Sequence, residues 1–239
     1  MSEFGEAFRF IVHNGAIPGE PGLPSLAHLA FETLWVGAIG IAIAVVLAAP
    51  LGIWLGHIHR GSFFAINTGN VGRALPSLAV LAIGDAFLGL GLPVVVLALV
   101  VLAFAPIVTN AYLGVVEVDP DLVDAARGMG MGELEVLRRV ELPLAVPLIF
   151  AGIRTAALFV ISTVTIASLA GFSGTLGDII ANETSYHFYG VLGAAICVAA
   201  LALAVEGALG LLQRAVTPRG VRLERAQTEA MAEAVSATV

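Results

Sequence analysis

Ionisable side chains are concentrated in one run, VDPDLVDAARGMGMGELEVLRRVELP, which extends from Val118 to Pro143 between two apolar segments. Carboxylates and guanidinium groups at this density are by themselves typical of a solvated loop. No combination of nucleophile, general base and metal ligands stands out, and the sequence contains no lysine. A P-loop holds phosphates through Gly-Lys-Ser/Thr, so the sequence has no P-loop. We therefore predict a protein that is not an enzyme, with no catalytic residue, no metal site and no nucleic-acid partner.

Other polar residues lie inside apolar segments, where they mark function or paired groups. For Asp85 we consider a cation-attracting role, and for Glu206 packing or a place at an interface. A further group either lines a translocation path or forms hydrogen bonds between helices: Thr109, Asn110, Thr155, Ser162 and Thr165. His57 and His59 form a His-X-His pair without further ligands nearby, so we expect loop residues at the lipid headgroups.

Composition indicates that lipid is the solvent for most of the chain, because 59% of residues are hydrophobic, 12% are charged and the mean hydropathy is +0.98. A membrane-spanning helix needs roughly 20 apolar residues, and five runs reach about that length. They are Phe31–Gly56, Val71–Leu90, Leu92–Val115, Val146–Ala170 and Tyr189–Leu212. The second is interrupted by Pro76 and glycines, which favours a short or broken helix. The runs lack the alternation of a membrane barrel, so the fold class is an all-α membrane protein.

Arginines predict the orientation of this bundle, because basic residues favour the cytoplasmic side. Those that follow spans one, three and five are Arg60, Arg127, Arg138, Arg139, Arg214, Arg219, Arg222 and Arg225, whereas Arg9 lies on the opposite side. We expect the amino terminus outside and the carboxyl terminus in the cytoplasm. Residues 1–25 form an extracytoplasmic segment, either a surface helix with Phe4, Phe8 and Ile11 on one face or a disordered head. Residues 26–212 form the transmembrane domain, and residues 213–239 a cytoplasmic tail.

Residues 117–143, here called the charged loop, are predicted to form two short helices. Asp119 can cap the first helix and Pro120 suits its first position. Glycines 128, 130 and 132 break that helix, and a second helix extends from Glu133 to about Val140 until Pro143 ends it. In span one, a stripe of small residues predicts close packing against another helix: Ala44, Ala48, Gly52 and Gly56.

The charged loop resembles the EAA loop of permease subunits in binding-protein-dependent ABC importers. That pattern is Glu-Ala-Ala, three residues, Gly, nine residues, then Ile, any residue, Leu and Pro. Here the matching residues are Asp124, Ala125, Ala126, Gly130, Val140, Leu142 and Pro143. Every spacing is kept, and Asp and Val replace Glu and Ile.

The resemblance implies a type I ABC importer permease fold in the cell membrane of a prokaryote. It implies that the charged loop couples the membrane domain to a separate nucleotide-binding ATPase subunit. The two alanines allow close approach to that partner, and the side chains that offer charge to it are Asp124, Arg127, Arg138 and Arg139. No cofactor is expected here, since the partner binds ATP. A second permease chain, identical or homologous, and a separate extracytoplasmic substrate-binding protein complete the expected complex; the length leaves no room for a fused receptor.

Three further stretches are similar to the permeases for osmoprotectants such as glycine betaine, choline, carnitine and proline. They are Glu141–Ala156, Gly72–Ala79 and Thr175–Asp178, the last containing Leu-Gly-Asp. Two alternatives stay open. One is the same importer class with an amino-acid cargo such as methionine; the other is an autonomous channel or ion-driven carrier, which gives no reason for the spacing in the charged loop.

Overall fold

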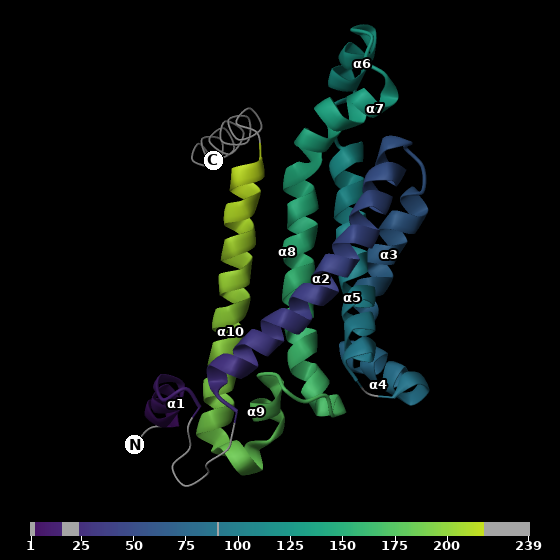
Figure 1. Cartoon of the computed structure of the whole chain (residues 1–239). Helices are drawn as coiled ribbons and strands as arrows, with labels where there is room; N and C mark the ends of the chain where they lie inside the picture. The colour runs from purple at the N-terminus through teal and green to yellow at the C-terminus, as the bar shows by residue number, and fades with distance from the viewer. Residues whose placement is uncertain (1–2, 16–23, 90, 218–239) are drawn as a thin grey trace, which may run out of the picture.

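The computed structural model describes residues 3–15, 24–89 and 91–217, and within these ranges the regular structure is entirely helical. The elements are α1 (Glu3–Val12), α2 (Leu26–His57), α3 (Ser62–Ala74), α4 (Ser77–Leu88), α5 (Leu92–Val116), α6 (Pro120–Gly128), α7 (Glu133–Val136), a π-helical turn (Leu137–Glu141), α8 (Leu142–Ala167), a 3₁₀ turn (Ser168–Ala170), α9 (Gly177–Ala181) and α10 (Glu183–Val216). Helices α2, α5 and α8 form the centre, with α3 against α5 and α10 against α8 (Figure 1).

Within the described residues, four helices are long and apolar enough to cross a membrane: α2, α5, α8 with its preceding turns, and α10. The fifth expected span is the bent pair α3 and α4, whose axes differ by 92°. The break falls at Leu75, which is extended, and Pro76, since a residue before proline is driven out of the helical region. The broken helix is therefore confirmed, but it begins at Ser62 rather than at Val71.

Close contact between α2 and α5 depends on the small residues of α2. Ala44 and Ala48 are fully buried, and a Cβ atom on Gly52 would lie 2.6 Å from the Val108 carbonyl oxygen. At Gly56 a Cβ would lie 2.8 Å from Val115 Cβ. The predicted small-residue face is thus confirmed, and α5 is the helix that packs on it.

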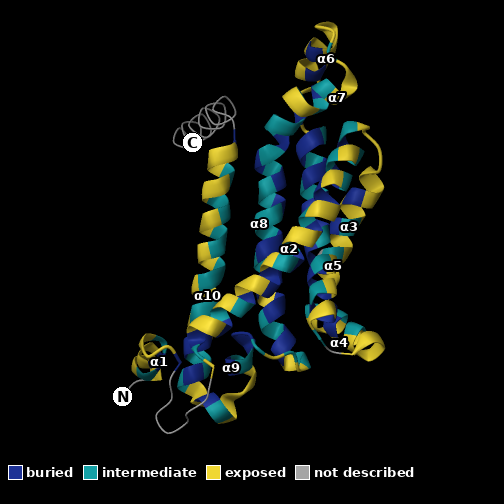
Figure 2. Ribbon diagram, viewed as in Figure 1, coloured by how far each residue is buried: buried dark blue, intermediate teal, exposed yellow. Residues whose placement is uncertain are grey.

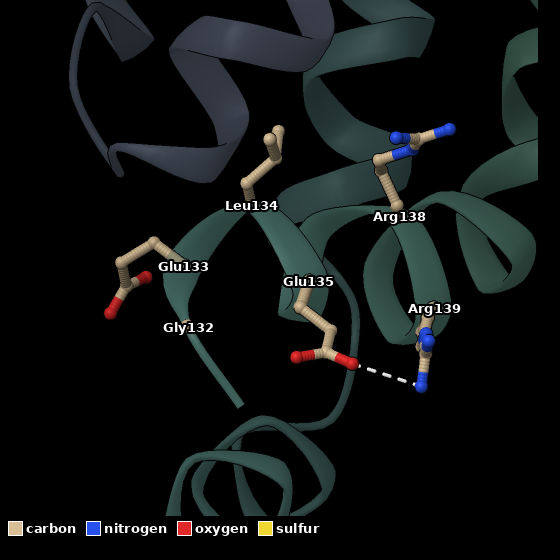
Figure 3. Close-up of a pocket in the computed structure, with 6 residues that line it drawn as sticks. All are labelled: Gly132, Glu133, Leu134, Glu135, Arg138 and Arg139. Atoms are coloured by element: carbon tan, nitrogen blue, oxygen red, sulfur yellow. Dashed lines mark ion pairs between the residues drawn. The ribbon is translucent and has the colours of Figure 1, made fainter. Parts of the chain in front are cut away.

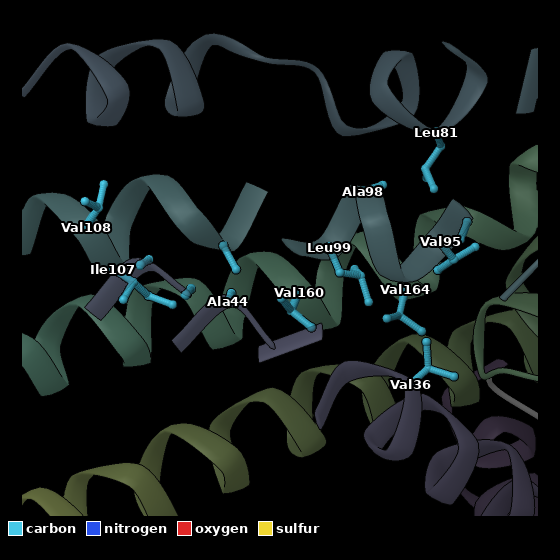
Figure 4. Close-up of a cluster of buried hydrophobic side chains, with 14 of the residues drawn as sticks. Val36, Ala44, Leu81, Val95, Ala98, Leu99, Ile107, Val108, Val160 and Val164 are labelled. Atoms are coloured by element: carbon cyan, nitrogen blue, oxygen red, sulfur yellow. The ribbon is translucent and has the colours of Figure 1, made fainter. Parts of the chain in front are cut away.

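The core fills the space between α2, α5 and α8 with aliphatic side chains (Figure 4). It includes Val36, Ala44, Leu81, Val95, Ala98, Leu99, Ile107, Val108, Val160 and Val164. Among the four spanning helices, burial is greatest along α5 and least along α10 (Figure 2). The centre of this single chain is consequently packed and apolar.

The first helix, α1, is attached to the start of α10. Phe10 is buried and meets Tyr186 and Tyr189 edge to face, with ring centroids 6.5 and 6.2 Å apart. Phe4 and Phe8 are largely exposed on the other side of α1. The predicted helix in the amino-terminal segment is therefore present, while residues 16–23 of that segment and residues 218–239 of the predicted tail lie outside the described residues. Residues 213–216 of the tail continue α10.

Candidate functional site

The charged loop joins α5 to α8 and projects from one end of the bundle, at the same end as the close of α10 and opposite to α1 (Figure 1). Its first helix, α6, begins as predicted. Asp119 is the N-cap and its Oδ1 accepts a hydrogen bond of 2.9 Å from the Asp121 amide, while Pro120 occupies the first turn. A rigid helix is thereby placed at the tip.

A glycine turn reverses the chain after α6. The Gly130 amide donates to the Arg127 carbonyl at 2.9 Å, and the Met131 amide donates to the Ala126 carbonyl at 3.2 Å. This pair of bonds is a Schellman motif, which needs a left-handed residue, and Gly130 has φ +90°. Gly130 therefore returns the chain toward α6, as the motif spacing predicted.

The second half of the loop differs from the prediction that Pro143 ends a helix. α7 passes through the π turn directly into α8, with Pro143 in the first turn of α8. The Leu142 amide donates to the Leu137 carbonyl, five residues back. The wider turn accommodates a proline that lacks an amide hydrogen, so the chain stays helical.

The inner face of the loop has an apolar core of its own, formed by Val118, Val123, Ala126 and Val136 with Met131, Val140 and Leu144 packed around it. The prediction that both alanines of the motif face a partner is therefore wrong for Ala126, which is 1% exposed. Ala125 is exposed. Ala126 is small because α6 must lie close to α7.

The outer face combines exposed apolar and charged side chains. Leu122, Met129 and Leu134 are 49%, 72% and 67% exposed at the tip of the molecule. A surface hollow of about 730 Å³ lies beside Leu134 (Figure 3). It is lined by Gly132, Glu133, Leu134, Glu135, Arg138 and Arg139. Exposed leucine and methionine ringed by charge are typical of a protein-docking surface.

Ion pairs hold the two helices of the loop together. Arg127 donates from Nε and Nη2 to the two carboxylate oxygens of Glu133 at 3.2 and 2.9 Å, and its Nη1 lies 3.6 Å from Asp124 Oδ1. The hydrogen bond and the charge of Glu133 raise the pKa of Arg127, so its guanidinium stays charged. Two residues predicted to face the partner, Asp124 and Arg127, thus also bind each other.

His57 was expected to be a loop residue at the headgroups, and the structure shows otherwise. It is the last residue of α2, its side chain is 12% exposed, and its Nδ1 lies 2.6 Å from Oε2 of Glu141, which is 1% exposed. Apolar runs did not reveal this contact, because it joins residues 84 positions apart. The sequence feature that could have indicated a buried partner for His57 was Glu141, a glutamate directly before the apolar Leu142.

The hydroxyl and amide side chains predicted for a translocation path each donate a hydrogen bond to a backbone carbonyl. Thr109 donates to the Ala65 carbonyl of α3 at 2.7 Å, which is the interhelical alternative. Asn110, Thr155, Ser162 and Thr165 each donate to the carbonyl four residues before them in their own helix. Ser162 is exposed on α8, and so is Phe159, which lies three residues before it.

The ionisable residues of the spans have different surroundings. Asp85 is exposed on α4. Glu206 of α10 accepts a hydrogen bond of 2.7 Å from Arg154 of α8, and Gln213 lies 3.4 Å from the same guanidinium. The expectation of a packing position for Glu206 is confirmed. The sequence analysis did not identify Arg154 as the partner of Glu206, although Arg154 supplies an opposite charge in the preceding span.

The residues of the stretch Thr175–Asp178 form packing and hydrogen-bond contacts with neighbouring helices and turns. Thr175 Oγ1 lies 3.0 Å from Ser168 Oγ, the Leu176 amide donates to Thr33 Oγ1 at 3.0 Å, and Asp178 accepts from the Gly174 amide. A Cβ on Gly177 would meet the Thr165 carbonyl oxygen. This element therefore fixes α9 against α8 and α2.

Comparisons with known proteins agree with this arrangement. A family model described as the binding-protein-dependent transport system inner membrane component matches residues 22–218. The glycine betaine/carnitine/choline transport system permease protein OpuCB of Bacillus subtilis is 36% identical over 192 residues, which are 80% of this chain and 88% of that protein. The carnitine transport permease protein OpuCB of Listeria monocytogenes is 38% identical over 196 residues, 82% of this chain and 89% of that protein.

Among solved structures, an inward facing conformation of the MetNI methionine ABC transporter contains a chain that superposes with a TM-score of 0.69. The superposition covers 81% of this chain and 96% of that one at 21% sequence identity. At this identity the likeness shows the fold alone.

Proposed function

The chain belongs to the family of binding-protein-dependent transport system inner membrane components, and on that basis we propose that it is the membrane-spanning permease subunit of an ATP-driven importer for osmoprotectants. Its all-helical fold is that of the permeases of type I ABC importers, and it lies in a bacterial membrane. Glycine betaine, choline, carnitine and proline are the proposed cargoes. Relatives at 36–38% identity are named for three of them.

The observation that carries the proposal is the charged loop, which presents exposed Leu122, Met129 and Leu134 at the tip of the molecule. A solvated loop without a partner would not need apolar side chains there. We assign this surface to a separate ATPase subunit. Docking uses Ala125, Arg138 and the outer charges, while Gly130, Val140, Leu142 and Pro143 shape the loop and pass its movement into α8.

Hydrolysis of ATP belongs to that partner, because the sequence has no lysine for a P-loop. Loaded cargo is delivered by a separate extracytoplasmic substrate-binding protein. The arginines next to the charged loop support a cytoplasmic position for this end and an outer position for α1. Alternating access then follows, because the ATPase and the receptor each stabilise one of two states of the membrane domain.

A second permease chain, identical or homologous, completes the path. The centre of the single chain is filled by aliphatic side chains from α2, α5 and α8. A zwitterion or cation cannot cross this packed core without losing its hydration. We place the path on the outer surface of α8, where Thr155 and Ser162 supply hydroxyl groups, with Thr165, Thr109, Asn110 and Asp85 as the further candidates named from the sequence.

Reconstitution tests the proposal. The chain is incorporated in liposomes alone, and together with the ATPase, receptor and second permease encoded beside it. ATP-dependent uptake of radiolabelled choline, carnitine, proline or glycine betaine by the complete complex is the expected result. Uptake of methionine instead would give the amino-acid alternative, and uptake by the chain alone without ATP would establish an autonomous carrier.

A further inference from the structure

A buried contact between His57 and Glu141 joins the end of α2 to the end of the charged loop. Glu141 lies in the π turn with its side chain 1% exposed, and its Oε2 is 2.6 Å from Nδ1 of His57. A buried carboxylate without a partner is strongly unfavourable, so Glu141 keeps this position only while His57 is present. The pair therefore couples the position of the π turn to the position of α2.

The contact extends through the loop to its tip. His57 Nε2 lies 3.8 Å from Glu133 Oε2, and Glu133 accepts both hydrogen bonds from Arg127 of α6. Side-chain contacts thus run from Arg127 of α6, through Glu133 of α7, to His57 of α2. The covalent route from the charged loop leads into α5 and α8, whereas the side-chain contacts of His57 with Glu141 and Glu133 lead from the loop to α2.

Movement of the end of α2 would not stay local. Gly56 lies one residue before His57, and its backbone is packed so closely on α5 that an added Cβ would lie 2.9 Å from the Tyr112 carbonyl oxygen. Helices in such contact move as a unit, because there is no space to take up the displacement. A force applied to the loop and received by His57 is therefore delivered to α2 together with α5.

We propose that His57 is a positioning residue for energy coupling: through Glu141 and Glu133 it holds α2 to the charged loop, so that a displacement of the loop moves α2 as well as α8. This inference rests on the proposed function, because the displacement comes from the ATPase. It assigns the transmission of movement to a side chain of α2, outside the charged loop itself.

Three variants test the role of His57 in the reconstituted complex. His57→Leu removes the hydrogen-bond donor, and His57→Asn restores an amide N–H near the position of Nδ1. The double variant His57→Leu/Glu141→Leu replaces the buried ion pair by apolar side chains, which is often neutral for stability. His59→Asn is the matched control, since His59 is exposed, has φ +51°, and its Nδ1 lies 3.1 Å from the His57 carbonyl oxygen rather than near another helix.

The readouts are assembly with the ATPase, ATP hydrolysis, and choline or glycine betaine uptake per ATP hydrolysed. We expect His57→Leu and the double variant to assemble and hydrolyse ATP, with uptake per ATP lowered about tenfold. His57→Asn should recover most of the ratio, and His59→Asn should match the wild type. A purely structural pair predicts instead that the double variant, once assembled, transports normally, which would overturn the proposal.

Hydrogen exchange supplies a readout that needs no cargo. In the wild-type complex, ATP should change the exchange of amides at residues 52–58 of α2 and at residues 120–136 of the loop. In the double variant the change at the loop should persist and the change at α2 should disappear. An unaltered response of α2 would refute the role of His57, whereas a wild-type complex that neither assembles nor transports would refute the proposed function.

Discussion

At the scale of single residues, the candidate site depends on a few residues with different structural roles. Gly130 supplies a positive φ, Ala126 supplies a small buried side chain, and Leu134 supplies an exposed apolar one. The motif contains Gly130 and Ala126 but not Leu134, and the structure separates the residues that shape the loop from those that can touch a partner.

Gly130→Ala tests the shaping role. At φ +90° an alanine is strained by about 1–3 kcal/mol, although nothing lies within 4 Å of the added Cβ. We expect weaker assembly with the ATPase, measured by co-purification, and lower uptake.

Gly128→Ala is the control for this change. Nothing lies within 4 Å of its added Cβ either, and it is the last residue of α6, where alanine favours the helix. Its assembly should equal the wild type. Equal behaviour of the two variants would show that the turn geometry does not matter.

Much of the local structure of the charged loop could be predicted from the sequence, and there is a physical reason why the remaining contacts could not. The Asp119 cap and the Gly130 turn depend on neighbours within four residues, so local spacing predicts them. The inward direction of Ala126 depends on Val136, and that of His57 on Glu141. Such contacts across the chain leave no periodic pattern within one segment.

At the scale of helices, close contacts and cross-helix charges fix the bundle. The positions of α5, α8 and α10 follow from apolar length, whereas the early start of α3 does not, because Ser62–Ala74 contains polar residues as well as apolar ones. The π turn was also unpredicted, since Pro143 ordinarily interrupts a helix and here the wider turn absorbs it.

Gly52→Ala tests the contact between α2 and α5. The new methyl group would lie 2.6 Å from the Val108 carbonyl oxygen and 2.7 Å from Ala111 Cβ. Because backbone cannot move aside cheaply, we expect a loss of about 1–3 kcal/mol in the free energy of unfolding. Gly207→Ala in α10 has nothing within 4 Å and serves as the control in thermal unfolding in detergent.

The Arg154–Glu206 pair tests the attachment of α10 to α8. Each side chain is 35% exposed, so the loss from Arg154→Leu should be smaller than for a fully buried pair, about 2 kcal/mol. The unpaired Glu206 causes this loss. Arg154→Leu/Glu206→Leu should therefore recover most of the melting temperature, and a double variant less stable than the single one would contradict this explanation.

At the scale of the whole molecule, the packed centre places the solute path on an outer surface that needs a second chain. α8 presents Ser162 on such a surface, while the adjacent Thr163 is 2% exposed. The sequence named Ser162 as a candidate, but it could not distinguish a free face from a covered one, because that depends on which helices pack together.

Cysteine labelling tests this placement in the assembled complex. With Cys197, the one natural cysteine, changed to alanine, Ser162→Cys should react with a charged thiol reagent that cannot cross lipid. Thr163→Cys should stay unreactive. Protection of Ser162→Cys by added choline would support a lumen, and equal inertness of both positions would place this face against lipid or protein.

The π turn at Leu137–Glu141 also determines the rotational orientation of the loop about the axis of α8. It holds one residue more than an α-helical turn, and each residue of an α-helix advances by about 100° around the axis. Deleting one residue there would swing Leu134 and its hollow by more than a quarter revolution about α8. The number of residues between Val136 and Leu142 thus determines the direction, around the axis of α8, from which the ATPase subunit must approach.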